Sequence, residues 1–135
     1  MRDYVILTDS CCDLTAEEIT ELGLTVLPLT YTLDGVNHKN DVFHPEMTNQ
    51  EFFQKIREGA DCSTSAVSVG EFHDAMRPIL ESGKDILCVS FSSALSTTYQ
   101  SACIAAEDLR PEFPEARIIV IDSLSASRGQ GMLLW

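Results

Sequence analysis

One stretch of the sequence indicates the class of fold: Asp85-Ile86-Leu87-Cys88-Val89-Ser90-Phe91. Its apolar residues are continuous, which is typical of a β-strand that is buried on both faces, as in a parallel sheet. The serine-rich residues 92–99 follow this strand and lead into an alanine-rich helix that ends before Pro111. The stretch therefore predicts one strand–helix unit of a layered α/β protein.

The rest of the chain repeats this alternation of strands and helices. Capping boxes at Thr15, Thr48 and Ser68 each place a glutamate three residues after a hydroxyl residue, which predicts three helix starts. The other predicted strands cover residues 4–8, 25–31 and 117–121, with a small hairpin at the Asp34-Gly35 turn and a polar loop at 61–68. We therefore predict an α/β fold with a mainly parallel sheet flanked by helices.

The composition limits the possible partners. The chain has 135 residues and a net charge of −12, so its length suits one domain, residues 1–135. The acidic balance argues against nucleic acid and anionic membranes, because phosphates would be repelled. No apolar run is long enough to predict a membrane span, and the first residues do not resemble a signal peptide.

Five cysteines at positions 11, 12, 62, 88 and 103 lack the spacing of a zinc site or of a C-x-x-C motif. We expect free thiols, mostly packed as small apolar side chains, in a cytoplasmic protein with no metal site. His38, His44 and His73 lie away from the serine clusters in the sequence, so we predict no catalytic base among them.

Polar residues gather where the predicted strands end. Because ligands bind at the carboxyl ends of parallel strands, these clusters are predicted to meet along one edge of the sheet. The clusters are Thr8-Asp9-Ser10, the loop 63–68, Ser92-Ser93 and Asp122-Ser123.

The helices expected after Ser93 and Ser123 have no acidic residue in their first turn. Their N–H groups and dipoles are therefore predicted to be available to an external anion. Three of these loops, at 8–10, 63–68 and 92–98, contain no Lys or Arg, which favours a singly charged carboxylate over a polyphosphate. Helix capping is the better explanation of any one cluster taken alone, and only the clusters together favour a binding site.

An enzymatic alternative uses Asp9 as a phosphoryl acceptor. Asp9 follows the first strand, and Asp13 lies four residues later, but the second carboxylate expected two residues after the acceptor is replaced by Cys11. A serine hydrolase would need a G-x-S-x-G motif, which the sequence lacks.

The sequence resembles the DegV family of bacterial fatty-acid-binding proteins in several motifs that run in the family's order. These are Thr8-Asp9-Ser10, Asp13-Leu14, Pro28-Leu29, Asp34-Gly35, Thr64-Ser65, the segment 92–102 and the segment 122–131. Ala66-Val67 and Thr97 depart from the family pattern, and Arg128 adds a cation beside the last serine cluster.

The resemblance implies a two-domain protein, of which residues 1–135 would be the amino-terminal portion. It implies a long-chain fatty acid as ligand, with the carboxylate held by Thr64 and by one or more of Ser92, Ser93 and Ser96. The other candidates, Thr8, Asp9, Ser10, Asp122 and Ser123, would shape the rim. The bound acid would be presented to a separate fatty acid kinase, so no catalytic residue and no cofactor are expected in this chain.

The last residues, Met132-Leu133-Leu134-Trp135, are apolar and follow what looks like the start of a helix. We expect them to belong to a longer chain. A fragment that binds nothing and dimerises through this apolar end is a further alternative.

Overall fold

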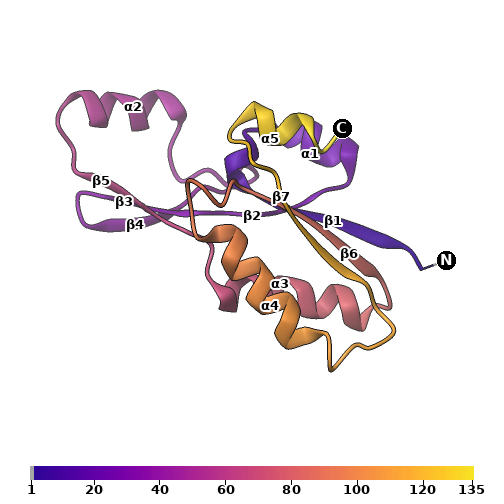
Figure 1. Ribbon diagram of the computed structural model, residues 1–135. Helices are drawn as coiled ribbons and strands as arrows, with labels where there is room; N and C mark the ends of the chain where they lie inside the picture. The colour runs from indigo at the N-terminus through magenta and orange to yellow at the C-terminus, as the bar shows by residue number, and fades with distance from the viewer. Residues whose placement is uncertain (1) are drawn as a thin grey trace.

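The computed structural model describes residues 2–135 as a parallel sheet covered by helices, joined to a small second sheet (Figure 1). The parallel sheet has the strand order β2-β1-β6-β7. Its strands are β1 (Tyr4–Asp9), β2 (Thr25–Leu27), β6 (Asp85–Ser90) and β7 (Ile118–Asp122). The predicted fold class is therefore confirmed.

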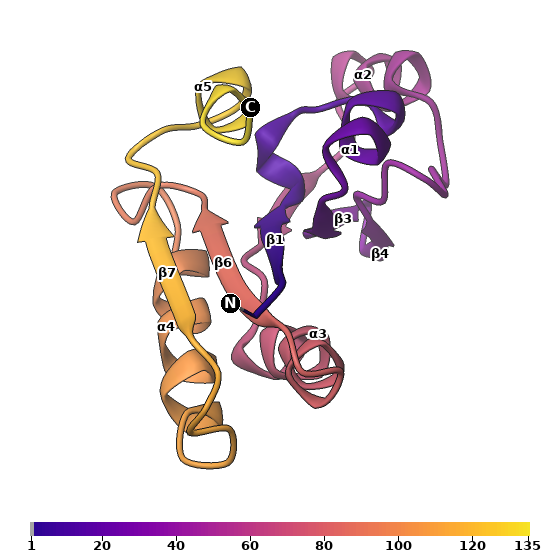
Figure 2. The same cartoon turned by 90° about the vertical axis from the view of Figure 1, so that its right-hand side faces the viewer.

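Helices cover both faces of this sheet (Figure 2). On one face, α3 (Val69–Glu81) and α4 (Thr98–Leu109) enclose a core that contains Leu7, Phe72 and Cys88. On the other face, α1 (Ala16–Leu22) and the chain end after α5 (Arg128–Met132) pack near β1, where Ile19, Val89 and Leu134 share a second core. Leu134 is thus buried, whereas Met132, Leu133 and Trp135 are exposed.

The second sheet is antiparallel and has the order β4-β3-β5. Its strands are β3 (Thr30–Leu33), β4 (Val36–Lys39) and β5 (Cys62–Ser65), and α2 (Asn49–Arg57) lies between β4 and β5 in sequence. The turn at Asp34-Gly35 was correctly predicted, and both residues have positive φ, as such a hairpin turn requires. The rings of Tyr31, His38 and Phe52 pack together over this sheet.

Two sequence predictions about the strands were wrong. The predicted strand 25–31 is divided, because Pro28 cannot donate to a ladder and the chain leaves the parallel sheet there for the small one. The predicted polar loop 61–68 contains β5, because β3 supplies a partner for a hydroxyl-rich segment that has little strand propensity of its own.

The helix starts follow the sequence closely. All three capping boxes are present, at the starts of α1, α2 and α3. The helix α3 continues through Pro78 to Glu81. Pro78 is exposed, as is Asp74 one turn earlier, so water can satisfy the carbonyl group that the proline leaves unpaired. A short 3-10 turn, η1 (Ser10–Cys12), joins β1 to α1.

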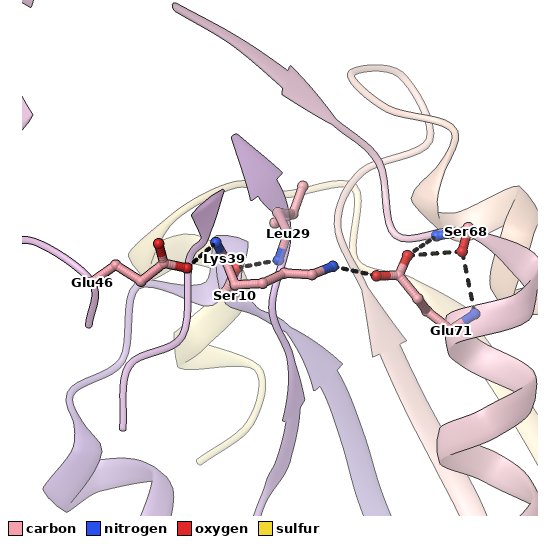
Figure 3. A network of polar contacts seen from close by, with 6 residues as sticks. All are labelled: Ser10, Leu29, Lys39, Glu46, Ser68 and Glu71. Atoms are coloured by element: carbon pink, nitrogen blue, oxygen red, sulfur yellow. Dashed lines mark hydrogen bonds and ion pairs between the residues drawn. The ribbon is translucent and has the colours of Figure 1, made fainter. Parts of the chain in front are cut away.

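A polar network attaches the small sheet to the main body (Figure 3). The Ser10 hydroxyl accepts hydrogen bonds from the backbone N–H of Leu29 at 3.0 Å and from the side chain of Asn40 at 3.2 Å. Lys39 on β4 forms an ion pair with Glu71, the capping glutamate of α3. The Ser10 bonds hold the residues beside the antiparallel sheet to the end of β1, and the Lys39–Glu71 pair holds β4 to the start of α3.

Candidate functional site

The predicted edge of the sheet exists. The strands β1, β6 and β7 are parallel, and Ser90 at the end of β6 is paired with Asp122 at the end of β7. The residues after these strands are also hydrogen-bonded to one another: Ser92 N–H donates to Ser125 O, and Ser123 N–H donates to Ser90 O, both at 3.1 Å. The polar clusters after β1, β6 and β7 are therefore brought together at the carboxyl end of the sheet.

Asp9 lies beneath this edge and is fully buried. One of its oxygens accepts from Phe91 N–H at 2.8 Å and from the Ser90 hydroxyl at 3.3 Å. The other accepts from Cys11 N–H at 3.1 Å and from the side chain of Gln130 at 3.2 Å. Burial raises the pKa of Asp9, and these hydrogen bonds oppose the rise.

This environment does not favour Asp9 as a phosphoryl acceptor. A nucleophilic carboxylate needs an oxygen that the phosphoryl group can reach, and both Asp9 oxygens are occupied and buried. Among residues 2–135, no group of three or more Asp, Glu, His or Cys side chains is arranged to hold a metal ion.

Thr8 and Ser10 also have structural roles. Thr8 is buried and donates its hydroxyl to Val89 O at 2.7 Å, which joins β1 to β6. Ser10 is buried and binds the small sheet through Leu29 and Asn40, as described above. Ser123, also buried, closes a turn with Ser125. These three buried side chains support the carboxyl edge of the sheet through their hydrogen bonds.

The segment 92–96 forms a turn above this buried layer. Leu95 N–H and Ser96 N–H both donate to Ser92 O. Ser92 is buried and its hydroxyl accepts from Ala94 N–H, whereas Ser93 is exposed. Ser96 is half-buried and shares a hydrogen bond of 2.9 Å with the Thr98 hydroxyl. Of the three serines, Ser93 is the most accessible to a ligand.

The helix α4 starts directly after this turn. Its N-cap residue Thr97 makes no side-chain capping bond, and its first turn contains no acidic residue, as the sequence predicted. The prediction that the N–H groups here are available to an anion is wrong for the first one, because the Ser96 hydroxyl accepts from Thr98 N–H at 3.2 Å. The dipole of α4 still favours negative charge at this end of the helix.

Thr64 reaches the protein surface from the other sheet. It lies on β5, paired with Tyr31 of β3, and is exposed. Three residues later, Val67 is buried in the main core with Leu7 and Cys88, which anchors the end of β5 to the parallel sheet. The two parts of the predicted carboxylate site therefore come from different sheets.

Arg128 does not act as a free cation beside the serines. Its guanidinium binds both carboxylate oxygens of Glu18 on α1, at 2.7 and 2.8 Å. Arg128 lowers the pKa of Glu18 to about 2, with further help from Thr15. The expectation that Arg128 supplies a cation to the last serine cluster is not met in this arrangement, because the charge is already paired.

Gln130 is a residue that the sequence reasoning missed. It is fully buried and donates to both Thr8 and Asp9, so it attaches α5 to β1. A possible signal was the pair of glycines beside it. A Cβ atom at Gly131 would lie 2.7 Å from Cys12 O, so only glycine allows α5 to pack this closely on η1.

The thiols have the environment expected of packed side chains. Cys12 and Cys88 are buried, the other three are half-buried, and all five are free. Burial, with the nearby negative charge of Asp9, raises the pKa of Cys11 to about 12, so its thiol stays protonated at neutral pH. In the part of the chain that the structure describes, no helix has the length and hydrophobicity to cross a bilayer.

The chain was compared with protein families and with curated proteins. The model of the family described as "Uncharacterised protein, DegV family" matches residues 3–135. A DegV domain-containing protein from Clostridium perfringens is 37% identical over 135 residues, which are 100% of this chain and 46% of the relative. Another, from Lactococcus lactis, is 36% identical and is matched over 97% of this chain and 45% of the relative. The chain thus spans about half the length of these relatives.

Solved structures show the same fold. A stearic-acid-binding protein from Eubacterium ventriosum superposes with a TM-score of 0.87 at 30% identity, over 97% of this chain and 45% of that one. A DegV family protein from Thermus thermophilus, described by its fatty acid binding, has a TM-score of 0.84 and 38% identity, over 99% of this chain and 45% of that one.

Proposed function

The chain belongs to the DegV family, and we propose that it takes part in binding a long-chain fatty acid through the acid's carboxylate. The carboxylate would be held by Thr64 and Ser93, with Ser92 and Ser96 shaping the turn that carries Ser93. The observation that carries this proposal is the position of Ser93, which is exposed at the sheet edge before the start of α4, where the first turn has no acidic residue. Similarity to two fatty-acid-binding proteins supports it.

The chemistry of this edge suits a single negative charge. Hydroxyl groups donate hydrogen bonds to a carboxylate without bringing a full positive charge, and a helix N-terminus adds a favourable field. Arg128, which follows the last serine cluster in the sequence, is paired with Glu18. A phosphate ester would carry up to two charges, and the charges of Arg128 and Lys39 are already paired with Glu18 and Glu71.

The hydrocarbon tail would need more apolar surface than the carboxylate site offers. Each methylene that is removed from water contributes about 0.8 kcal/mol. Two surface hollows of about 260 and 210 Å³ are lined by other residues, such as Lys55 and Phe113, and by none of the candidates. We therefore place the tail against a second domain of a two-domain protein, in which residues 1–135 form the first.

The role of the bound acid is the last part of the proposal. The head group would lie at an exposed rim, where a separate fatty acid kinase could reach it. The protein would then be a carrier that presents its ligand and performs no chemistry itself. The long-chain fatty acid and the kinase are the partners that this proposal names.

A chain-length series tests the proposal. Native mass spectrometry of the purified protein should show a bound mass of a long-chain acid, and calorimetric titration with saturated acids from hexanoate to palmitate should show affinity rising with length. Equal affinities along the series would show that only the head group binds. No binding of palmitate by the full-length, two-domain protein would refute the proposed function.

A further inference from the structure

Asp122 connects the two loops that form the rim. Its Oδ1 atom accepts a hydrogen bond from Ser93 N–H at 3.1 Å, across 29 residues. The same oxygen accepts from Leu124 N–H at 3.0 Å. One carboxylate oxygen therefore holds the backbone of the turn after β6 and the backbone of the turn after β7.

The turn after β7 depends on this contact. Leu124 has a φ of 49°, in the left-handed region that residues with a side chain rarely adopt, and it is 75% exposed. An exposed leucine gains little from packing, so its conformation must be held by hydrogen bonds. The bond to Asp122, the Ser92–Ser125 bond and the bonds between Ser123 and Ser125 together hold this turn beside Ser93.

We propose that Asp122 is a positioning residue, which holds Ser93 in place for the ligand carboxylate and does not bind the ligand itself. The inference rests on the proposed function. The hydrogen bonds show why the role is geometric: Oδ1 is already shared by two backbone donors, and a carboxylate offers no proton to a second carboxylate.

The charge of Asp122 opposes ligand binding, whereas its hydrogen bonds favour it. The side chain of Ser93, followed by the N–H groups of Leu124 and Ser93, lowers the pKa of Asp122, so the residue is ionised at neutral pH. Because a hydroxyl has one proton, the Ser93 side chain must turn from Asp122 to donate to a ligand, while the Ser93 N–H bond to Asp122 can remain. A like charge near a bound carboxylate is unfavourable. An asparagine would keep an oxygen that can accept both N–H groups, but without the charge.

Two substitutions at this position separate the two effects. Asp122→Ala removes the acceptor and the charge, and Asp122→Asn removes the charge alone. Asp108→Ala is the control, because it removes an exposed aspartate of α4 outside the rim. Each variant is made in the full-length, two-domain protein and titrated with palmitate, its thermal unfolding midpoint is measured, and the hydrogen exchange of the Ser93 amide is followed.

We expect Asp122→Ala to bind palmitate about tenfold more weakly, because the substitution removes the hydrogen bond that holds Ser93. Asp122→Asn is expected to recover at least the parent affinity and to keep the Ser93 amide protected from exchange. Asp108→Ala should bind as the parent does.

Parent affinity in Asp122→Ala, or a tenfold loss in Asp122→Asn, would overturn the role of Asp122. If Asp122→Ala does not fold, the palmitate affinity of Asp122→Asn is the test: parent affinity supports the role of Asp122, and a tenfold loss overturns it. Failure of the parent protein itself to bind palmitate is a distinct result, because it refutes the proposed function and the inference that rests on it.

Discussion

Gln130 donates its buried side-chain amide to Asp9 at 3.2 Å, although 121 residues separate them in the chain. The contact joins the last helix to the end of the first strand. The opposite atom of the same amide, Oε1, is buried and has no partner within the described residues. Asp9, which also holds Phe91 N–H, thereby links α5 to the start of the Ser92–Ser96 turn.

Removal of the candidate hydroxyls should weaken ligand binding. Thr64→Ala and Ser93→Ala each delete a proposed donor to a charged carboxylate, so each should cost about 1–3 kcal/mol in palmitate binding by the full-length protein. Calorimetric titration measures the effect. Ser63→Ala is the matched control, because successive strand residues point to opposite faces of β5. Unchanged affinity in both variants would exclude these residues from the site.

Gly131 should tolerate no larger side chain. A Cβ atom there would lie 2.7 Å from Cys12 O and 2.9 Å from the Leu14 side chain. Gly131→Ala is therefore expected to destabilise the protein by about 1–3 kcal/mol, which thermal unfolding would detect. Gly129→Ala is the control, because its Cβ would meet Ser125 at an ordinary 3.5 Å. Equal thermal unfolding midpoints for Gly131→Ala and Gly129→Ala would contradict the close packing of α5 on η1.

Asp9 should make stability fall as the pH rises through the acid range. Burial raises the pKa of Asp9 above 3.8, so the folded protein retains this proton at a pH where the unfolded chain has lost it. The free energy of unfolding, relative to Asp9→Asn, should decrease as pH rises from about 3.8 and level off above the folded pKa. Urea unfolding at several pH values measures it, with Asp108→Asn as the charge control. If the free energy of unfolding of the parent, relative to Asp9→Asn, increased with pH, the hydrogen bonds to Asp9 would lower its pKa by more than burial raises it.

The contribution of Glu18 to stability should change with pH in the opposite direction to that of Asp9. Its pKa is lowered from 4.5 to about 2, first by the Arg128 side chain and then by Thr15. Its contribution to stability is therefore complete above pH 4.5 and is lost as pH falls toward 2. Comparison of the parent with Glu18→Gln by urea unfolding should show this loss, and Glu17→Gln, an exposed neighbour, should not. A pH-independent difference would mean that the Arg128 pair is not formed in solution.

Local sequence determined the helix starts, the hairpin turn and the class of sheet. The capping boxes at Thr15, Thr48 and Ser68 each act within four residues of the chain. The apolar run at 86–89 predicts a buried strand whatever the order of the strands in the sheet. These features depend on neighbours along the chain. The position of the candidate residues at one edge of the sheet was also predictable, because the carboxyl ends of parallel strands lie at the same edge.

Tertiary structure alone decided the second sheet, the division of the strand at Pro28 and the partners of the polar side chains. The segment 62–65 becomes a strand only because β3 lies beside it, and Arg128 is neutralised only because Glu18 of α1 reaches it. Gln130 and Asp122 gain their roles from Asp9 and Ser93, which lie 121 and 29 residues away. A hydrogen bond is specified by the positions of both partners, and the chain sets those positions only after its strands have paired.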